Sequence, residues 1–267
     1  MIASLGMYDL PWLRAATDAL WAALRDRLRA GGMDDVPDAL DRSRPLAEIW
    51  RDPGLLLAQS CGYPLVFSLR DAVRLVGTPC YDLPGCAGPD YCSFIVVARG
   101  NPAQGTAGLR GARAAINGGD SQSGMSALRG AVAPLAGGKP FFREVVVTGA
   151  HMRSLDAVRD GSADVAALDC VTWGLTAAGQ QSRLDGLRVL ASTPATPGLP
   201  LVTAASRSDR MVAMLRDAWR AVVADPALAD MRAELHLAGI APASLADYAP
   251  VSAMRAMAEA LGYPELR

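Results

Sequence analysis

The sequence predicts an α/β fold with mostly parallel sheets flanked by helices. Short apolar segments alternate along the chain with longer amphipathic segments, which is typical of βαβ units. The apolar segments are continuous, which fits strands that are covered on both faces. Hydrophobic residues make up 51% of the 267 residues and charged residues 20%, so we expect a substantial buried core and no extensive disorder.

The first elements show the pattern. Residues 2–8 form a predicted strand, and Asp9 is a candidate N-cap for a helix over residues 11–30, with Pro11 just inside it. Gly31 and Gly32 end this helix. Further strands are predicted at residues 55–58, 73–77, 93–98, 112–117, 145–148, 163–168 and 187–190, and helices at residues 60–69, from about 125, 152–160, 209–224 and 226–237.

Polar residues stand at the ends of several predicted strands. In open α/β sheets, ligands bind outside the carboxyl ends of the strands. A hydrophobic core does not require polar residues at these ends, whereas a binding site does. The segments in question are Tyr8-Asp9, Gln59-Ser60-Cys61, Ser121-Gln122-Ser123, Gly149-Ala150-His151 and Asp169.

The turn from Ser121 to Gly124 is the strongest candidate for an anion site. It leads from a strand into a helix, where free backbone N–H groups and the helix dipole favour negative charge. The hydroxyls of Ser121, Ser123 and Ser126 add donors. Simple capping by one serine is the alternative, and the local sequence leaves both readings open. The turn lacks the ending of a Walker loop.

His151 and Asp169 are candidates at neighbouring strand ends. His151 can donate a hydrogen bond to an oxyanion, although a lone histidine is more often structural. Asp169 can accept a proton from a ligand or cap the next helix. Tyr8 and Tyr91 can each offer a phenol to a site or simply pack. No sequence motif of a hydrolase, metalloprotease or redox enzyme is present, and we predict no catalytic residues, metal or cofactor.

The five cysteines do not form a disulfide framework, because their number is odd and they are widely spread. Cys80, Cys86 and Cys92 recur in one loop, so a disulfide, a metal site or plain thiols all remain open there, with thiols favoured. Whether Cys61 is reactive is also open.

The charge balance excludes some partners. The formal net charge is −1, from 26 Lys and Arg against 27 Asp and Glu, which provides no general field for nucleic acid or an anionic membrane. No apolar run is long enough to span a membrane. No secretory signal is visible, so we expect a cytoplasmic protein, or a periplasmic one if a signal has been removed.

Linked motifs resemble one family. The stretch from Thr148 to Asp169 is similar to the pattern "TGxHxxSLxAVxxGxADVAAxD" of the phosphate, phosphite and phosphonate substrate-binding components of ABC transporters. The turn Ser121-Gln122-Ser123-Gly124 resembles the Ser-Thr-Ser-Gly anion loop of that family. The segment Gln59–Pro64 is similar to that of a less characterised branch.

The resemblance implies a two-lobed, type II periplasmic-binding-protein-like fold with two hinge strands. Lobe one would comprise residues 1–96 and 205–267, and lobe two residues 97–204. Ser121, Gln122, Ser123 and Gly124 would hold the anion, His151 would donate to it, and Asp169 would meet its protonated or amino-bearing part. Further ligand contacts would come from Tyr8, Cys61, Gly62 and Tyr91.

We therefore expect a solute-binding protein that closes on a small oxyanion such as a phosphonate, phosphite or phosphate, without chemistry of its own. Its partner would be an ABC permease. The alternative is an enzyme or a cytoplasmic sensor on the same fold, acting on a larger phosphorylated or heterocyclic molecule.

Overall fold

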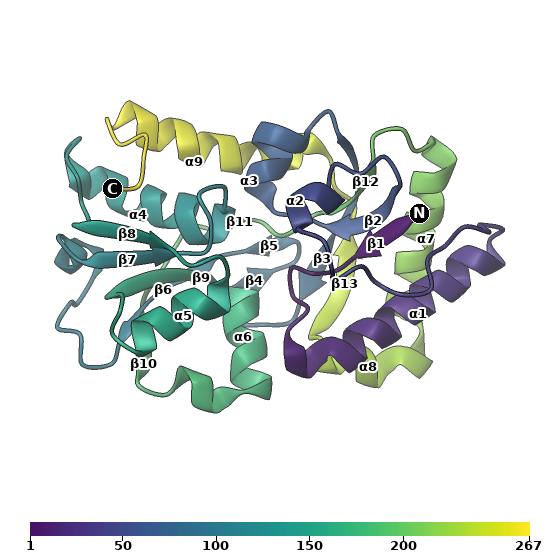
Figure 1. Ribbon diagram of the computed structural model, residues 1–267, viewed down its shortest axis with the longest axis horizontal. Helices are drawn as coiled ribbons and strands as arrows, with labels where there is room; N and C mark the ends of the chain where they lie inside the picture. The colour runs from purple at the N-terminus through teal and green to yellow at the C-terminus, as the bar shows by residue number, and fades with distance from the viewer. The chain divides into compact units, whose positions relative to one another are not determined.

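The computed structural model describes residues 1–267, and the chain divides into two compact units. Each unit contains one five-stranded sheet with helices packed against it (Figure 1). Unit 1 comprises Met1–Asp82, Ala87–Pro89 and Pro197–Asp247, and unit 2 comprises Leu83–Cys86, Asp90–Thr196 and Tyr248–Arg267.

The sheet of unit 1 has the strand order β1-β2-β12-β3-β13. Strand β1 (Ile2–Ser4) runs parallel to β2 (Leu55–Gln59). Strand β12 (Leu201–Ala204) is antiparallel to both β2 and β3 (Val73–Tyr81), and β13 (Leu237–Ala241) is antiparallel to β3. All residues of β2 are buried, as its continuous apolar sequence predicts.

Two long helices of unit 1 pack together, and one of them contacts the sheet. Helix α1 (Arg14–Ala30) packs against α7 (Asp209–Ala224), which also contacts β3 and β13. Ser208 caps α7, because its hydroxyl accepts a hydrogen bond from the Met211 N–H. The shorter helical segments of unit 1 are the 3₁₀ turns Pro11–Leu13 and Pro226–Leu228, the helices α2 (Leu46–Ile49), α3 (Gly62–Pro64) and α8 (Ala229–Glu234), and the π-helical turn Leu65–Leu69.

The sheet of unit 2 has the strand order β10-β6-β9-β7-β8. Strand β7 (Arg113–Ile116) is parallel to β8 (Glu144–Val147) and to β9 (Val165–Asp169). Strand β6 (Ser93–Ala98) is antiparallel to β9 and to β10 (Leu187–Ser192). The carboxyl ends of β7, β8 and β9 therefore lie at one edge of the sheet.

Helices cover both faces of this sheet. In Figure 1, α5 (His151–Arg159) and α6 (Cys170–Gly179) lie on one side, and α4 (Ala127–Ala136) and α9 (Ala249–Ala260) lie on the other. Shorter helical segments are Thr106–Leu109, Gln122–Ser126, Gln181–Leu184 and Leu245–Tyr248. One apolar core of unit 2 consists of Val96, Ala115, Leu155, Val158, Ala163, Ala166, Leu168, Leu184 and Leu187.

A third, small sheet is formed by the strands β4 (Cys86–Ala87), β5 (Asp90–Tyr91) and β11 (Thr196–Pro197), in the order β11-β5-β4. These strands lie where the chain passes from one unit to the other, since the unit boundaries fall within or next to them.

The α/β class is as expected, but both large sheets are mixed, not mostly parallel. Strands β12 and β13 in unit 1 and β6 in unit 2 pair antiparallel with their neighbours. We expected no strand at residues 201–204 or 237–241, because the periodicity of these short segments does not reveal a pairing with β2 and β3, which are distant in sequence.

Three local expectations at the ends of elements were wrong. The first strand ends at Ser4, whose partner in β2 is Ala58, and a turn follows at Gly6. Asp9 caps no helix, because its carboxylate accepts a hydrogen bond from Arg42 at 3.1 Å. The helix expected over residues 226–237 stops at Glu234, and His236 adopts a positive φ of 50° before β13 begins.

The compact units differ at their boundaries from the lobes expected over residues 1–96 plus 205–267 and 97–204. Residues 90–96 fall in unit 2, because β6 pairs with β9 and β10. Residues 197–204 fall in unit 1, because β12 lies between β2 and β3. Residues 248–267 fall in unit 2, because α9 packs against α4 and Arg129 donates a hydrogen bond to the Pro264 carbonyl.

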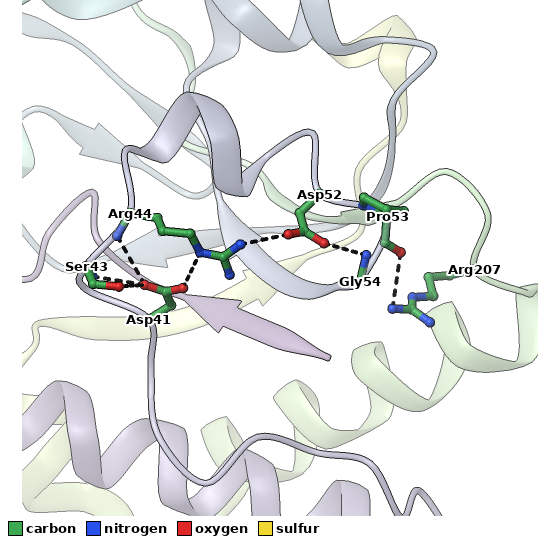
Figure 2. A network of polar contacts seen from close by, with 7 residues as sticks. All are labelled: Asp41, Ser43, Arg44, Asp52, Pro53, Gly54 and Arg207. Atoms are coloured by element: carbon green, nitrogen blue, oxygen red, sulfur yellow. Dashed lines mark hydrogen bonds and ion pairs between the residues drawn. The ribbon is translucent and has the colours of Figure 1, made fainter.

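A half-buried network of charged groups holds the segment between β1 and β2 (Figure 2). The Asp41 carboxylate accepts hydrogen bonds from the backbone and hydroxyl of Ser43 and from Arg44, which also pairs with Asp52 at 2.8 Å. The Ser43 backbone N–H is the largest cause that lowers the pKa of Asp41 to about 2. Asp52 in turn accepts from the Gly54 N–H, and Arg207 donates to the Pro53 carbonyl. We call this the Asp41 network.

None of the helices combines the length and the apolar character that crossing a bilayer requires.

Candidate functional site

Polar side chains of unit 2 gather at the carboxyl ends of three neighbouring strands. Strand β7 leads to Asn117 and the serine turn, β8 leads to Thr148 and then His151, and β9 ends in Asp169. Because β7 lies between β8 and β9 and all three run parallel, these ends share one edge of the sheet.

The serine turn is a π-helical turn over Gln122–Ser126 that continues directly into α4. Ser121 is its N-cap, with its hydroxyl oxygen accepting a hydrogen bond from the Gly124 N–H at 2.9 Å. The Ser126 N–H donates to the Ser121 carbonyl at 2.9 Å, which defines the wide turn. The capping role therefore belongs to Ser121, while Ser123 and Ser126 have no part in it.

Gly124 is required by a close neighbour. A Cβ atom at this position would lie 1.9 Å from Oδ1 and 2.9 Å from Cγ of Asn117, and 3.3 Å from Cε1 of His151. The absence of a side chain thus lets the end of β7 approach the turn. Sequence analysis identified Gly124 but not Asn117, the residue that directly follows β7.

His151 links the turn to the end of β9. Its Nε2 lies 2.8 Å from Oγ of Ser123 and 3.2 Å from Oδ2 of Asp169. Asp169 also caps α6, because its Oδ1 accepts from the Thr172 N–H and its Oδ2 from the Thr172 hydroxyl, both at 2.7 Å. The side chains of His151 and Asp169 are 12% and 3% exposed. We call Ser123, His151, Asp169 and Thr172 the His151 network.

The His151 network is not a catalytic triad. In such a triad the nucleophile and the carboxylate contact different nitrogens of the imidazole. Here Ser123 and Asp169 both contact Nε2, and Nδ1 has no partner at ordinary hydrogen-bond geometry. Burial lowers the pKa of His151, and the opposing effects of the Asp169 charge and the Ala167 backbone are smaller. The imidazole is therefore neutral at neutral pH.

Buried polar atoms beside this network have no hydrogen-bond partner, namely Oδ1 of Asn117 and Oγ of Ser126. Buried polar atoms in folded proteins are nearly always paired, so a cluster of exceptions marks a place where a ligand or solvent supplies the partners.

Of the other predicted site residues, some belong to unit 1 and some to unit 2. Gln122 is buried, and its amide contacts Sδ of Met254 on α9 at 3.5 Å, a contact that sequence analysis missed because α9 was not expected in this unit. Tyr91 is buried in unit 2 at the end of β5. Tyr8, Cys61 and Gly62 belong to unit 1, where Tyr8 packs edge-to-face against Tyr81.

Thr172 was also missed as part of the site. The signal was present in the sequence, since Asp169 and Thr172 are three residues apart at the junction of a strand and a helix, the spacing of an N-cap and the N–H it accepts from.

The family follows from a comparison with family models. The model of "ABC transporter, phosphonate, periplasmic substrate-binding protein" matches residues 68–248, which include the serine turn, His151 and Asp169. The chain belongs to this family. Its members are substrate-binding components of transporters rather than enzymes, so this chain binds a solute and its family partner is an ABC permease. Among the curated proteins, none matches this sequence.

Solved structures show the same two-lobed fold across almost the whole chain. PhnD1 from Prochlorococcus marinus, in complex with methylphosphonate, is 15% identical, with a TM-score of 0.75 and 97% of each chain covered. A binding-protein component of an ABC phosphonate transporter from Pseudomonas aeruginosa is 15% identical, with a TM-score of 0.74, covering 97% of this chain and 86% of that chain. XAC2383 from Xanthomonas citri, bound to chloride, is 14% identical, with a TM-score of 0.70 and 97% of each chain covered.

Proposed function

We propose that this family member binds a small phosphorus oxyanion, a phosphonate, phosphite or phosphate, at the edge of the unit 2 sheet and carries out no chemistry on it. The observation that carries the proposal is the contact of Ser123 with a neutral His151 whose Nε2 also lies 3.2 Å from the Asp169 carboxylate.

The hydrogen bonds within the site leave two hydroxyl protons for a ligand. Because the Asp169 carboxylate lies 3.2 Å from Nε2 of His151, we assign the proton of the neutral imidazole to Nε2, which then donates to Ser123. The oxygen of Ser123 then accepts, and its own O–H is left to donate. Ser121 is in the same state, since its oxygen accepts from the Gly124 N–H. Both serines therefore offer donors to the unprotonated oxygens of an oxyanion, which accept hydrogen bonds.

The helix adds to the attraction of an anion. The turn Gln122–Ser126 and α4 form one helical segment up to Ala136, and the first N–H groups of a helix have no earlier carbonyl of their own helix to bond. These groups and the helix dipole favour negative charge without a cation. A site of this kind needs no positively charged side chain, which agrees with a formal net charge of −1 for the chain.

We assign Asp169 a positioning role. Its Oδ1 accepts from Thr172 N–H, and its Oδ2 is engaged by the Thr172 hydroxyl and by His151. At 2% exposure, this carboxylate has little capacity left for the protonated or amino-bearing part of a ligand. The predicted ligand contacts of Tyr8, Cys61, Gly62, Gln122 and Tyr91 stay predictions.

The test is calorimetric titration of the protein with methylphosphonate, aminoethylphosphonate, phosphite, phosphate, sulfate and ATP. We expect selective binding of one small phosphorus oxyanion. Ser123→Ala and His151→Asn each remove a charge-assisted hydrogen bond or the residue that orients it, so each should weaken binding of that ligand about 10- to 100-fold.

Matched variants control for the substitutions themselves. Ser206 is an exposed serine of unit 1, and His236 is the second histidine, whose positive φ tolerates asparagine. Ser206→Ala and His236→Asn should leave the affinity unchanged. Unchanged affinity in both Ser123→Ala and His151→Asn would overturn the proposed site. Conversion of the bound ligand, followed by ³¹P NMR, would overturn the absence of chemistry.

ATP belongs in the panel because XAC2383 from Xanthomonas citri, which shares this fold, has also been solved bound to ATP. Selective binding of ATP would replace the small oxyanion by a larger phosphorylated ligand, and the solute-binding role of the family would stand.

A further inference from the structure

Three of the five cysteines meet in unit 2. Cys86 lies in β4, Cys92 directly follows β5, and Cys170 is the first residue of α6. The sulfur atoms of Cys86 and Cys170 are 3.5 Å apart, and the Cys170 N–H donates to the Cys92 carbonyl at 3.0 Å. The predicted group of Cys80, Cys86 and Cys92 is thus divided, since Cys80 lies in β3 of unit 1.

Gly85 lets these thiols come together. It has a φ of +94°, and its carbonyl accepts from the Cys92 N–H. A Cβ atom there would lie 2.8 Å from Cβ of Cys170 and 2.9 Å from the sulfur of Cys92. A side chain at position 85 would collide with the side chains of Cys92 and Cys170, so glycine is needed for the chain to pass close to both.

The three thiols differ in accessibility. Cys170 is fully buried and Cys92 is 9% exposed, whereas Cys86 is half-buried. Burial raises the pKa of Cys92 to about 11, and the hydrogen bond with Cys86 is the largest cause that raises the pKa of Cys170. No group of three or more His, Cys, Asp or Glu side chains is arranged to hold a metal ion. Two of its sulfur atoms, those of Cys86 and Cys170, are close enough for chemistry between them.

We propose that Cys86 and Cys170 form a reversible disulfide bond, with Cys92 as a third thiol beside the pair. A disulfide bond is about 2.05 Å long, so the two sulfur atoms must approach by about 1.5 Å from their 3.5 Å separation. Rotation about the side-chain bonds of the half-buried Cys86 is the simplest way to cover this distance.

The oxidant is a small-molecule disulfide such as oxidised glutathione. The Cys86 thiolate attacks one of its sulfur atoms, which breaks the S–S bond, forms a mixed disulfide and releases one glutathione thiolate. The Cys170 thiolate then attacks the Cys86 sulfur and releases the second glutathione. Cys86 and Cys170 together lose two electrons and two protons, and oxidised glutathione gains them.

Two facts bear on where the bond would form and what it would lie next to. The family is periplasmic, and disulfides form and persist in that compartment. Cys170 directly follows Asp169, the carboxylate that holds His151. A bond to Cys170 would join the start of α6 to the segment Leu83–Cys86, next to the His151 network.

Peptide mapping can test the bond. Trypsin places Cys80, Cys86 and Cys92 on one peptide, residues 75–99, and Cys170 on another, residues 160–183. After incubation of the full chain with oxidised glutathione, we expect these two peptides to be joined, with the loss of two hydrogen atoms, and to separate with dithiothreitol.

Variants identify the partner. The double variant Cys80→Ser/Cys92→Ser should form the joined peptide as fast as the wild type, because it keeps the proposed pair. Cys86→Ser should form it at least tenfold more slowly, and Cys80→Ser is the matched control in the same peptide. Absence of the joined peptide in the wild type, or equal rates in the wild type and Cys86→Ser, would overturn the proposal.

Discussion

The Asp41 network of unit 1 and the His151 network of unit 2 connect polar groups in opposite ways. The Asp41 network uses permanent charges near solvent, with the side chains of Arg44 and Asp52 35% and 28% exposed. The His151 network uses a neutral imidazole, hydroxyls and one carboxylate, with His151 and Asp169 almost fully buried. Each carboxylate of the Asp41 network accepts hydrogen bonds from more than one donor. Beside the His151 network, Oδ1 of Asn117 and Oγ of Ser126 have no hydrogen-bond partner.

The difference separates a structural role from the proposed binding role. Exposed ion pairs are screened by water, and each stabilises a protein by little. The Asp41 network therefore serves to hold a loop between two strands. A buried polar network is costly unless all its members are paired. Buried polar atoms without a hydrogen-bond partner, as Oδ1 of Asn117 and Oγ of Ser126 are beside the His151 network, are what the proposed ligand site requires.

The most direct test of the difference between the two networks is to remove one carboxylate from each. Asp169→Ala leaves buried donors of Thr172 and His151 without an acceptor and should lower the free energy of unfolding by about 3 kcal/mol. Asp41→Ala should cost about 1 kcal/mol, because water can replace the lost acceptor. Urea denaturation measures both. Equal losses would remove the distinction between the networks.

A second prediction concerns the close contact of Gly124 with Asn117. Gly124→Ala places a methyl group 1.9 Å from Oδ1 of Asn117 and should cost about 2 kcal/mol of unfolding free energy. Asn117→Ala removes the obstructing atoms, so the double variant should recover at least 1 kcal/mol of the summed losses.

Gly119→Ala is the control for this pair, since nothing lies within 4 Å of a Cβ atom at that glycine. It should change the free energy of unfolding by less than about 0.5 kcal/mol. Additive losses in the double variant would show that the contact with Asn117 does not set the requirement for glycine.

The smallest expected effect is a difference between the pH ranges in which the two networks lose their contribution to the free energy of unfolding. Burial keeps the pKa of His151 below its ordinary value of 6.5. Below about pH 6.5 the unfolded chain therefore binds a proton that the native protein excludes. The free energy of unfolding should then fall by up to about 1.4 kcal/mol per pH unit until the native pKa is reached. Asp41, whose pKa is about 2, contributes stability that is complete above pH 3.8 and is lost between about pH 4 and 2.

Unfolding free energies of the wild type, His151→Gln and Asp41→Asn across this pH range test both windows. His151→Gln should lack the loss that begins near pH 6.5, and Asp41→Asn should lack the loss between pH 4 and 2. Parallel curves for the wild type and His151→Gln between pH 7 and 5 would contradict the buried neutral imidazole.

Much of the unit 2 site could be located from the sequence because its members stand at strand ends. The apolar runs before Ser121, His151 and Asp169 predicted three strands, and parallel strands end at a common edge. The roles within the site could not be predicted. That Ser121 caps the turn while Ser123 contacts His151 depends on side-chain geometry that no spacing reveals.

The sequence by itself determined the α/β class, the long helices predicted over residues 11–30 and 209–224, and the family motif from Thr148 to Asp169. These depend on local periodicity, caps and linked residues. Only the tertiary structure decided that β12 enters between β2 and β3, that α9 covers unit 2, and that Cys86 lies against Cys170. The reason is physical: periodicity records which face of an element is buried, whereas its partner is chosen by packing between segments far apart in the chain.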